Sequence, residues 1–141
     1  MPIVWRDALC VDHGVIDNDH RHLIDLINAI EHTVTADGSI RQLQAALDQL
    51  ALYTGQHFSR EEDILISHHY ARFDDHKAQH IRLIEELADA ARPVRAVTDI
   101  DSPISAVLAA EDVGKLTELL RHWLLDHIIK EDLKIKPLLG C

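Results

Sequence analysis

The amino-acid sequence predicts an all-α fold, an antiparallel up-down-up-down four-helix bundle with a non-helical N-terminal arm. Four segments carry apolar residues at the three- and four-residue spacing of amphipathic helices. The composition is 47% hydrophobic but only 4% aromatic, with 5 Gly and 4 Pro, which favours aliphatic helix packing over sheets. A length of 141 residues suits one domain, divided into an arm over 1–17, a bundle over about 18–133 and a short tail.

Helical periodicity sets the expected helices, which cover about 18–36, 40–67, 73–91 and 112–133. Asp17 is the expected N-cap of the first helix and Asp37-Gly38 its stop. Ser39 is placed to cap the second, and Pro93 is expected to end the third. The apolar stripes of the last two helices comprise Ile81, Leu83, Ile84 and Leu87, then Leu116, Leu119, Leu120, Trp123, Leu124 and Ile128.

The segments between these helices set the topology. Two connections are short, so neighbouring helices are expected to run antiparallel. The third, over about 92–111, is long for a bundle and has room for an extra helical turn within 103–110. The first 16 residues lack periodicity, and we expect them to lie across the bundle with Trp5 as an anchor.

Charge and cysteine usage exclude several classes of protein. A net charge of −10 argues against binding to nucleic acid or anionic membranes, and it favours a monomer. No apolar run reaches 18 residues, and the charge at Arg6 comes too early for a secretory signal. Cys10 and Cys141 form no C-x-x-C pair, so we expect two unpaired thiols in a cytoplasmic protein.

Eleven histidines are several times the usual share for this length, and helical spacing places five of them on apolar stripes. Two carboxylates share these stripes: Glu61 stands one turn after a histidine, and Asp132 stands four residues after Ile128. The expected inward-facing set is His20, His57, Glu61, His76, His80, His127 and Asp132. The other histidines are expected either at the surface or in contact with the inward-facing ligands: His13, His22, His32, His68, His69 and His122.

Seven inward polar groups together indicate metal. A lone inward histidine is more often a hydrogen-bonded core residue than a ligand. Seven such groups exceed what an aliphatic core can satisfy, and no Lys or Arg stands at a matching position to pair the carboxylates. Seven donors also exceed the usual coordination of one ion, so two metals are implied. Imidazole with bridging carboxylate and no thiolate suits iron better than manganese or zinc.

Two known metal motifs are absent from the sequence. No Glu-x-x-His pair of the ferritin-like kind occurs, and neither does the H-E-x-x-H signature of zinc proteases. The predicted site is therefore unusually rich in histidine.

Four motifs in order resemble the hemerythrin family, in particular its bacterial single-domain members. They are Gly14-Val-Ile-Asp-Asn-Asp-His20, His57-Phe-Ser-Arg-Glu61-Glu62, His76-Lys-Ala-Gln-His80 and Trp123-Leu-Leu-Asp-His127-Ile-Ile-Lys-Glu-Asp132. His127 and Asp132 are five residues apart, so a π-like widening of the helix is expected to bring both to the metals.

The resemblance implies the ligand sets and the cofactor. His76, His80 and His127 are expected to bind one iron and His20 and His57 the other, with Glu61 and Asp132 bridging. The cofactor implied is two iron ions, cycling between Fe2+ and Fe3+, with a bridging oxo or hydroxo group. With that bridge the second iron keeps an open position, where O2 is expected to bind.

The resemblance also implies the function. We expect reversible O2 binding for carriage, storage or delivery rather than enzymatic turnover. Two alternatives stay open: an O2 or redox sensor read by a partner protein, and a di-iron enzyme acting on peroxide or nitric oxide.

Overall fold

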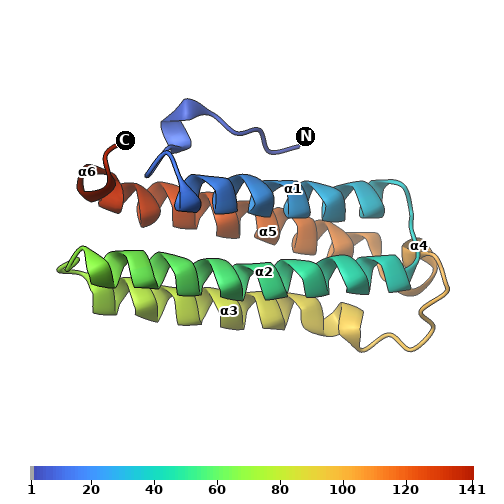
Figure 1. Ribbon diagram of the computed structural model, residues 1–141. Coiled ribbons are helices and arrows are strands. Elements are labelled where there is room, and N and C mark those ends of the chain that lie inside the picture. The colour runs from blue at the N-terminus through green and yellow to red at the C-terminus, as the bar shows by residue number, and fades with distance from the viewer. Residues whose placement is uncertain (1) are drawn as a thin grey trace.

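A computed structural model of the protein describes residues 2–141; Met1, with which the expected arm starts, lies outside them. Four long helices lie side by side and alternate in direction, as Figure 1 shows. They are α1 (Val15–Thr35), α2 (Ile40–Ser67), α3 (Phe73–Arg95) and α5 (Ala110–Lys130). Shorter elements are η1 (Asp7–Leu9), α4 (Ile104–Val107), η2 (Asp132–Ile135) and α6 (Lys136–Leu139). The predicted four-helix bundle is confirmed.

The N-terminal arm lies along the outside of α1 (Figure 1). Asn28 holds it there, because its side chain accepts from the backbone N–H of Ile3 and donates to the carbonyl of Ile3, both at 2.8 Å. Trp5 packs against the core, and the Arg21 guanidinium lies 4.6 Å from its ring centroid. The anchoring role expected for Trp5 is confirmed, and the arm contains one short 3-10 turn, η1.

The start of α1 differs from the prediction. The helix begins at Val15 with Gly14 as N-cap, so Asp17 lies inside its first turn. Asp12 satisfies the free backbone N–H groups instead, accepting from Gly14 at 2.8 Å and from Ile16 at 3.0 Å. The side chain of Asp17 does not cap α1 and is buried instead.

The turn between α1 and α2 forms hydrogen bonds with the long connection between α3 and α5. Ser39 caps α2 as expected, in a capping box with Gln42. The expected extra turn is present as α4, and the backbone N–H of Ile104 donates to Gly38 at 2.9 Å. Asp37 accepts from the backbone N–H of Ser105 at 2.9 Å. The connection thus folds over one end of the bundle.

Helix α3 shows two corrections. It continues through Pro93 to Arg95, because Ala91 and Val94 are buried in the core and hold the last turn in place. Ile81 and Ile84, expected on the apolar stripe, are 52% and 44% exposed. The buried face follows the line of the inward histidines and Leu87 instead; on α5, Leu119 is likewise exposed.

The end of α5 is also shorter than predicted. The helix stops at Lys130, and Asp132 begins the 3-10 helix η2 rather than continuing α5 to residue 133. No π-like widening is needed, because the tighter 3-10 turn changes the direction of the chain. Asp132 and Ile135 are both buried.

The arm and the C-terminal tail meet at the end of the bundle that carries η2 and α6 (Figure 1). Cys10 and Cys141 are joined there by a disulfide, so the expectation of two unpaired thiols is wrong. Neither segment is periodic, and nothing in their spacing predicts that they meet. None of the helices described between residues 2 and 141 is long and apolar enough to cross a bilayer.

Candidate metal centre

The seven residues predicted to face inward form one buried cluster. Each is at most 5% exposed, and they come from all four long helices and from η2. They are His20 (α1), His57 and Glu61 (α2), His76 and His80 (α3), His127 (α5) and Asp132 (η2). The other six histidines are exposed, as expected.

Glu61 directs its two oxygens to different histidines. Oε1 accepts from Nε2 of His76 and of His80, the latter at 3.1 Å. Oε2 lies 3.2 Å from Nε2 of His57 and 3.8 Å from Nε2 of His20. The carboxylate therefore lies between the histidines of α1 and α2 on one side and the histidines of α3 on the other.

Asp132 divides its oxygens in the same way. Oδ1 lies 2.9 Å from Nε2 of His127 and 3.1 Å from Nε2 of His76. Oδ2 lies 2.8 Å from Nε2 of His20. Because η2 turns away from the axis of α5, this carboxylate reaches histidines of α1, α3 and α5 together.

The cluster consequently divides into two ligand sets that share both carboxylates. The three-histidine half comprises His76, His80 and His127, and the two-histidine half comprises His20 and His57. In each half, one donor atom from every histidine and from both carboxylates lies within 4.8 Å of all the others. Either set could hold a metal ion, and a carboxylate oxygen from each shared residue faces each half.

The cluster contains buried polar atoms without hydrogen-bond partners, as a metal site should. Those directed at other cluster members are the Nε2 atoms of His20, His57 and His127, Oε2 of Glu61 and both oxygens of Asp132; Nδ1 of His20 and of His127 also lack partners. The histidine–carboxylate approaches described above at these atoms lack hydrogen-bond geometry. No Lys or Arg is among the buried residues of the described chain. Divalent ions would satisfy these donors, so the residues present fit metal.

The electrostatics show what the cluster does without metal. Burial would lower the pKa of His57, but the hydrogen bond with Asp19 and the close carboxylate of Glu61 outweigh it and raise that pKa to about 9. Burial would also lower the pKa of His76, while Asp132 and Glu61 raise it to about 10. Protons on these imidazoles offset the carboxylates, and a bound metal takes the place of those protons.

The two carboxylates show the opposite effect. Burial and the neighbouring charge of Asp132 would raise the pKa of Glu61, but the close imidazoles of His57, His76 and His80 hold it well below its usual range. Burial would likewise raise the pKa of Asp132, and the charge of His127 with the close imidazoles of His20 and His76 lowers it instead. Both groups are therefore anionic, which is the form that binds metal.

Two further carboxylates orient two of the imidazoles through their Nδ1 atoms. Asp19 lies 2.9 Å from Nδ1 of His57, and it also accepts from Tyr53 at 2.7 Å and from Arg60 at 2.8 and 2.9 Å. Glu62 lies 2.9 Å from Nδ1 of His80. An acceptor at Nδ1 leaves Nε2 free to bind metal.

Sequence reasoning did not identify these two acceptors. The available signal was only that each carboxylate precedes or follows a predicted ligand directly in the chain.

Phe58 forms the apolar wall of the cluster. Its ring stacks on His80 at a centroid distance of 3.8 Å and an interplanar angle of 6°. It also lies 5.6 Å from the ring of His57 and 5.5 Å from that of His127. A cavity of about 10 Å³ adjoins it, lined by Leu23, Phe58, Leu83, Trp123, Leu124 and His127.

Comparison with known proteins agrees with this geometry. The chain matches the hemerythrin HHE cation binding domain over residues 12–139. It is 31% identical to a bacteriohemerythrin of Methylococcus capsulatus over 128 residues, which cover 91% of this chain and 88% of that protein. A hemerythrin-like protein of Naegleria gruberi is 24% identical, covering 98% and 94%. The crystal structure of a wild-type hemerythrin superposes with a TM-score of 0.78 at 28% identity, covering 100% of both chains. The chain belongs to the hemerythrin family.

Proposed function

We propose that this protein binds O2 reversibly at a non-haem di-iron centre, for oxygen carriage, storage or delivery. Membership of the hemerythrin family implies a non-haem di-iron site. The observation that carries the proposal is the division of Glu61 and Asp132, each with one oxygen toward either half of the cluster. Two carboxylates placed in this way suit a pair of metal ions rather than one.

The ligand roles follow from that division. His76, His80 and His127 would hold one iron, His20 and His57 the other, and both carboxylates would bridge them. The three-histidine half would offer its iron three imidazoles and two carboxylates, and the two-histidine half would offer two imidazoles and the same two carboxylates. The two-histidine half lacks one ligand, so we assign O2 binding to this half. Two ferrous ions would supply the two electrons that O2 accepts on binding and returns on release.

The chain contributes orientation and exclusion of water. Asp19 and Glu62 hold His57 and His80 by their Nδ1 atoms, so that Nε2 of each faces the cluster. Phe58 covers three of the imidazoles and keeps the site apolar. A site with five imidazoles and two carboxylates is less electron-rich than a carboxylate-dominated one. We therefore propose binding in preference to O–O cleavage and enzymatic turnover.

Metal analysis and optical spectroscopy of the same sample test the proposal. Protein reduced without air is analysed for iron, and its spectrum is recorded before and after O2 is admitted and removed. Two irons per chain are expected, as for a di-iron site, with a visible band that appears with O2 and bleaches on its removal. A lower iron content, or a spectrum insensitive to O2, contradicts the proposal. Rapid autoxidation favours a sensor, and sustained consumption of peroxide or nitric oxide favours an enzyme.

We further propose a monomer in the cytoplasm. The net charge of −10 supports the monomer, since like-charged surfaces repel one another. Light scattering of the eluted protein checks the mass of 16.0 kDa expected for one chain. In a reducing compartment the Cys10–Cys141 pair would be held as thiols.

A further inference from the structure

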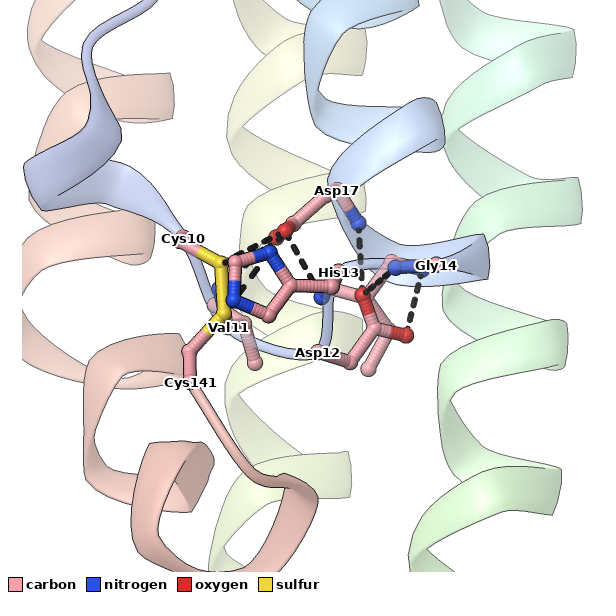
Figure 2. Close-up of a disulfide and its surroundings, with 8 residues drawn as sticks. Cys10, Val11, Asp12, His13, Gly14, Asp17 and Cys141 are labelled. Carbon is pink, nitrogen blue, oxygen red and sulfur yellow. Dashed lines mark hydrogen bonds between the residues drawn. A yellow bond between two sulfur atoms is a disulfide. The ribbon is translucent and has the colours of Figure 1, made fainter.

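A second cluster of metal-binding side chains surrounds the disulfide between the arm and the tail. Figure 2 shows Cys10 and Cys141 with His13 and Asp17 directed toward them. The Cα atoms of the two cysteines are 6.0 Å apart. One donor atom from each of these four residues lies within 4.8 Å of all the others. We call this group the cysteine cluster.

Asp17 is placed as an anionic ligand of this cluster. It is only 2% exposed, and it accepts from the backbone N–H of Val11 at 2.7 Å and of His13 at 2.9 Å. In the part of the chain that the structure describes, no Lys or Arg forms an ion pair with it. A buried carboxylate without a cation is costly, so the position favours a bound positive charge.

The sulfurs of the disulfide lie against polar groups to which they cannot donate a hydrogen bond. Cys10 Sγ lies 2.9 Å from Oδ2 of Asp17 and 3.2 Å from Nδ1 of His13, and Cys141 Sγ lies 4.0 Å from the same carboxylate oxygen. A thiol at Cys10 can donate to that oxygen. A disulfide sulfur has no proton, so it only places its lone pairs against the carboxylate. The surroundings therefore suit the reduced sulfurs better than the bonded ones.

The reduced donor set matches zinc. Two thiolates, one imidazole and one carboxylate supply four donors of the types that tetrahedral Zn2+ binds, and thiolate disfavours Mg2+ and Ca2+. Neighbouring donors in a tetrahedral zinc site are roughly 3.3–3.8 Å apart, given metal–ligand bonds of about 2.0–2.3 Å. The contacts of 2.9, 3.2 and 4.0 Å bracket that spacing. Opening the disulfide separates the two sulfurs and makes room for the ion.

We propose that Cys10, His13, Asp17 and Cys141 form a second metal site, which takes one zinc ion when the cysteines are reduced and is closed by their disulfide. An ion reaches it without crossing the core, because His13 is exposed and Cys141 half-buried. The start of α1 beside it adds the positive end of a helix dipole, which stabilises the thiolates. Either state ties the arm to the tail.

Cobalt(II) tests the site, because thiolate-to-cobalt charge transfer absorbs in the near ultraviolet and zinc is silent. Protein that retains its iron is reduced with a phosphine, freed of reductant without air and titrated with cobalt chloride. The expected result is a thiolate band that saturates at one cobalt per chain and disappears when zinc is added. Protein with the disulfide intact should give no band. The buried cluster contains no cysteine, so its own metal content cannot produce this signal.

Variants distinguish metal binding by all four residues from metal binding by the two cysteines alone. Cys10→Ser with Cys141→Ser should abolish the band, and His13→Ala should weaken cobalt binding about tenfold or more. His122→Ala, an exposed histidine on α5, is the matched control and should bind as the wild type does. Far-ultraviolet circular dichroism verifies that each variant is folded. No band in reduced wild type, or unchanged affinity in His13→Ala, overturns the proposed site.

Discussion

The two halves of the buried cluster share two carboxylates and differ by one histidine. His76, His80 and His127 surround one side of Glu61 and Asp132, while His20 and His57 surround the other. Both halves are buried: His20 and His57 are 0% exposed, and the histidines of the other half are at most 5% exposed. The histidine count is therefore the main difference between the two halves, and in the proposed function it would decide which metal accepts an external ligand. A structural site and a binding site can thus be built side by side from the same residue types.

The largest effect is expected from removing a carboxylate that both halves share. Glu61→Ala takes one ligand from each half, so both irons should be lost, and with them all O2-dependent absorption. Metal analysis of the purified variant measures this directly. Asp63→Ala is the control, since Asp63 is an exposed carboxylate on the same helix, α2, and its loss should leave the iron content unchanged. A Glu61→Ala protein that keeps one iron at full occupancy would show that the halves do not depend on a common bridge.

A smaller effect is expected from removing a histidine that belongs to only one half. His57→Ala should release the iron of the two-histidine half and end O2 binding, while the other iron stays, because its three histidines are untouched. Iron content and the spectrum after aeration report the two outcomes independently. His22→Ala, an exposed neighbour on α1, should behave as the wild type. Retention of O2 binding in His57→Ala would place the open position on the other half.

Metal-free protein should lose stability as the pH rises. His57 and His76 have folded-state pKa values raised to about 9 and about 10. Their stabilisation is complete below the unfolded value of about 6.5 and disappears as the pH rises through the folded values, at a cost on the order of 3 kcal/mol for His57 and on the order of 5 kcal/mol for His76. The Tm of metal-free protein should therefore fall between about pH 7 and about pH 10.

Two controls identify the source of that change. His57→Gln should reduce the decrease, since one of the two titrating groups is gone. Iron-loaded protein should show no such decrease, because its ligating imidazoles are already neutral. A metal-free protein whose Tm stays constant over this range would mean that the carboxylates do not hold protons on these histidines.

The smallest expected effects come from the carboxylates behind the ligands. Asp19→Asn removes the anionic acceptor at His57 Nδ1, and metal affinity of the two-histidine half should fall about 10- to 100-fold. Glu62→Gln is the matched change at His80, in the three-histidine half. Competition with a chelator measures both losses, and O2 affinity should respond mainly to Asp19→Asn. Equal effects of the two variants on O2 affinity would argue against an asymmetric centre.

Helical spacing was sufficient to predict the six cluster residues that stand on the long helices, because a buried stripe is a property of a single helix. It failed for the residues that act between helices. Asp19 of α1 orients a histidine of α2, and Glu62 of α2 orients a histidine of α3. Those contacts depend on the distance and rotation of neighbouring helices, which periodicity within one helix does not contain.

Chain ends and interruptions were predicted least well, for a related reason. Pro93 has a local preference to end a helix, but burial of Ala91 and Val94 keeps α3 intact around it. Asp132 was expected inside the cluster and is there, although α5 stops before it and a 3-10 turn positions it. The disulfide lies between two segments without any repeat, so only the folded chain brings its cysteines together.

The disulfide also determines how the protein responds to a broken backbone. Cys10 and Cys141 are 131 residues apart, and all seven members of the buried cluster lie between them. In the oxidised protein, a single protease cut in any intervening loop leaves one covalent molecule that still contains all seven members of the buried cluster. In the reduced protein the same cut produces two fragments joined only by packing and metal. The redox state of one cysteine pair therefore decides whether a nicked chain remains one molecule.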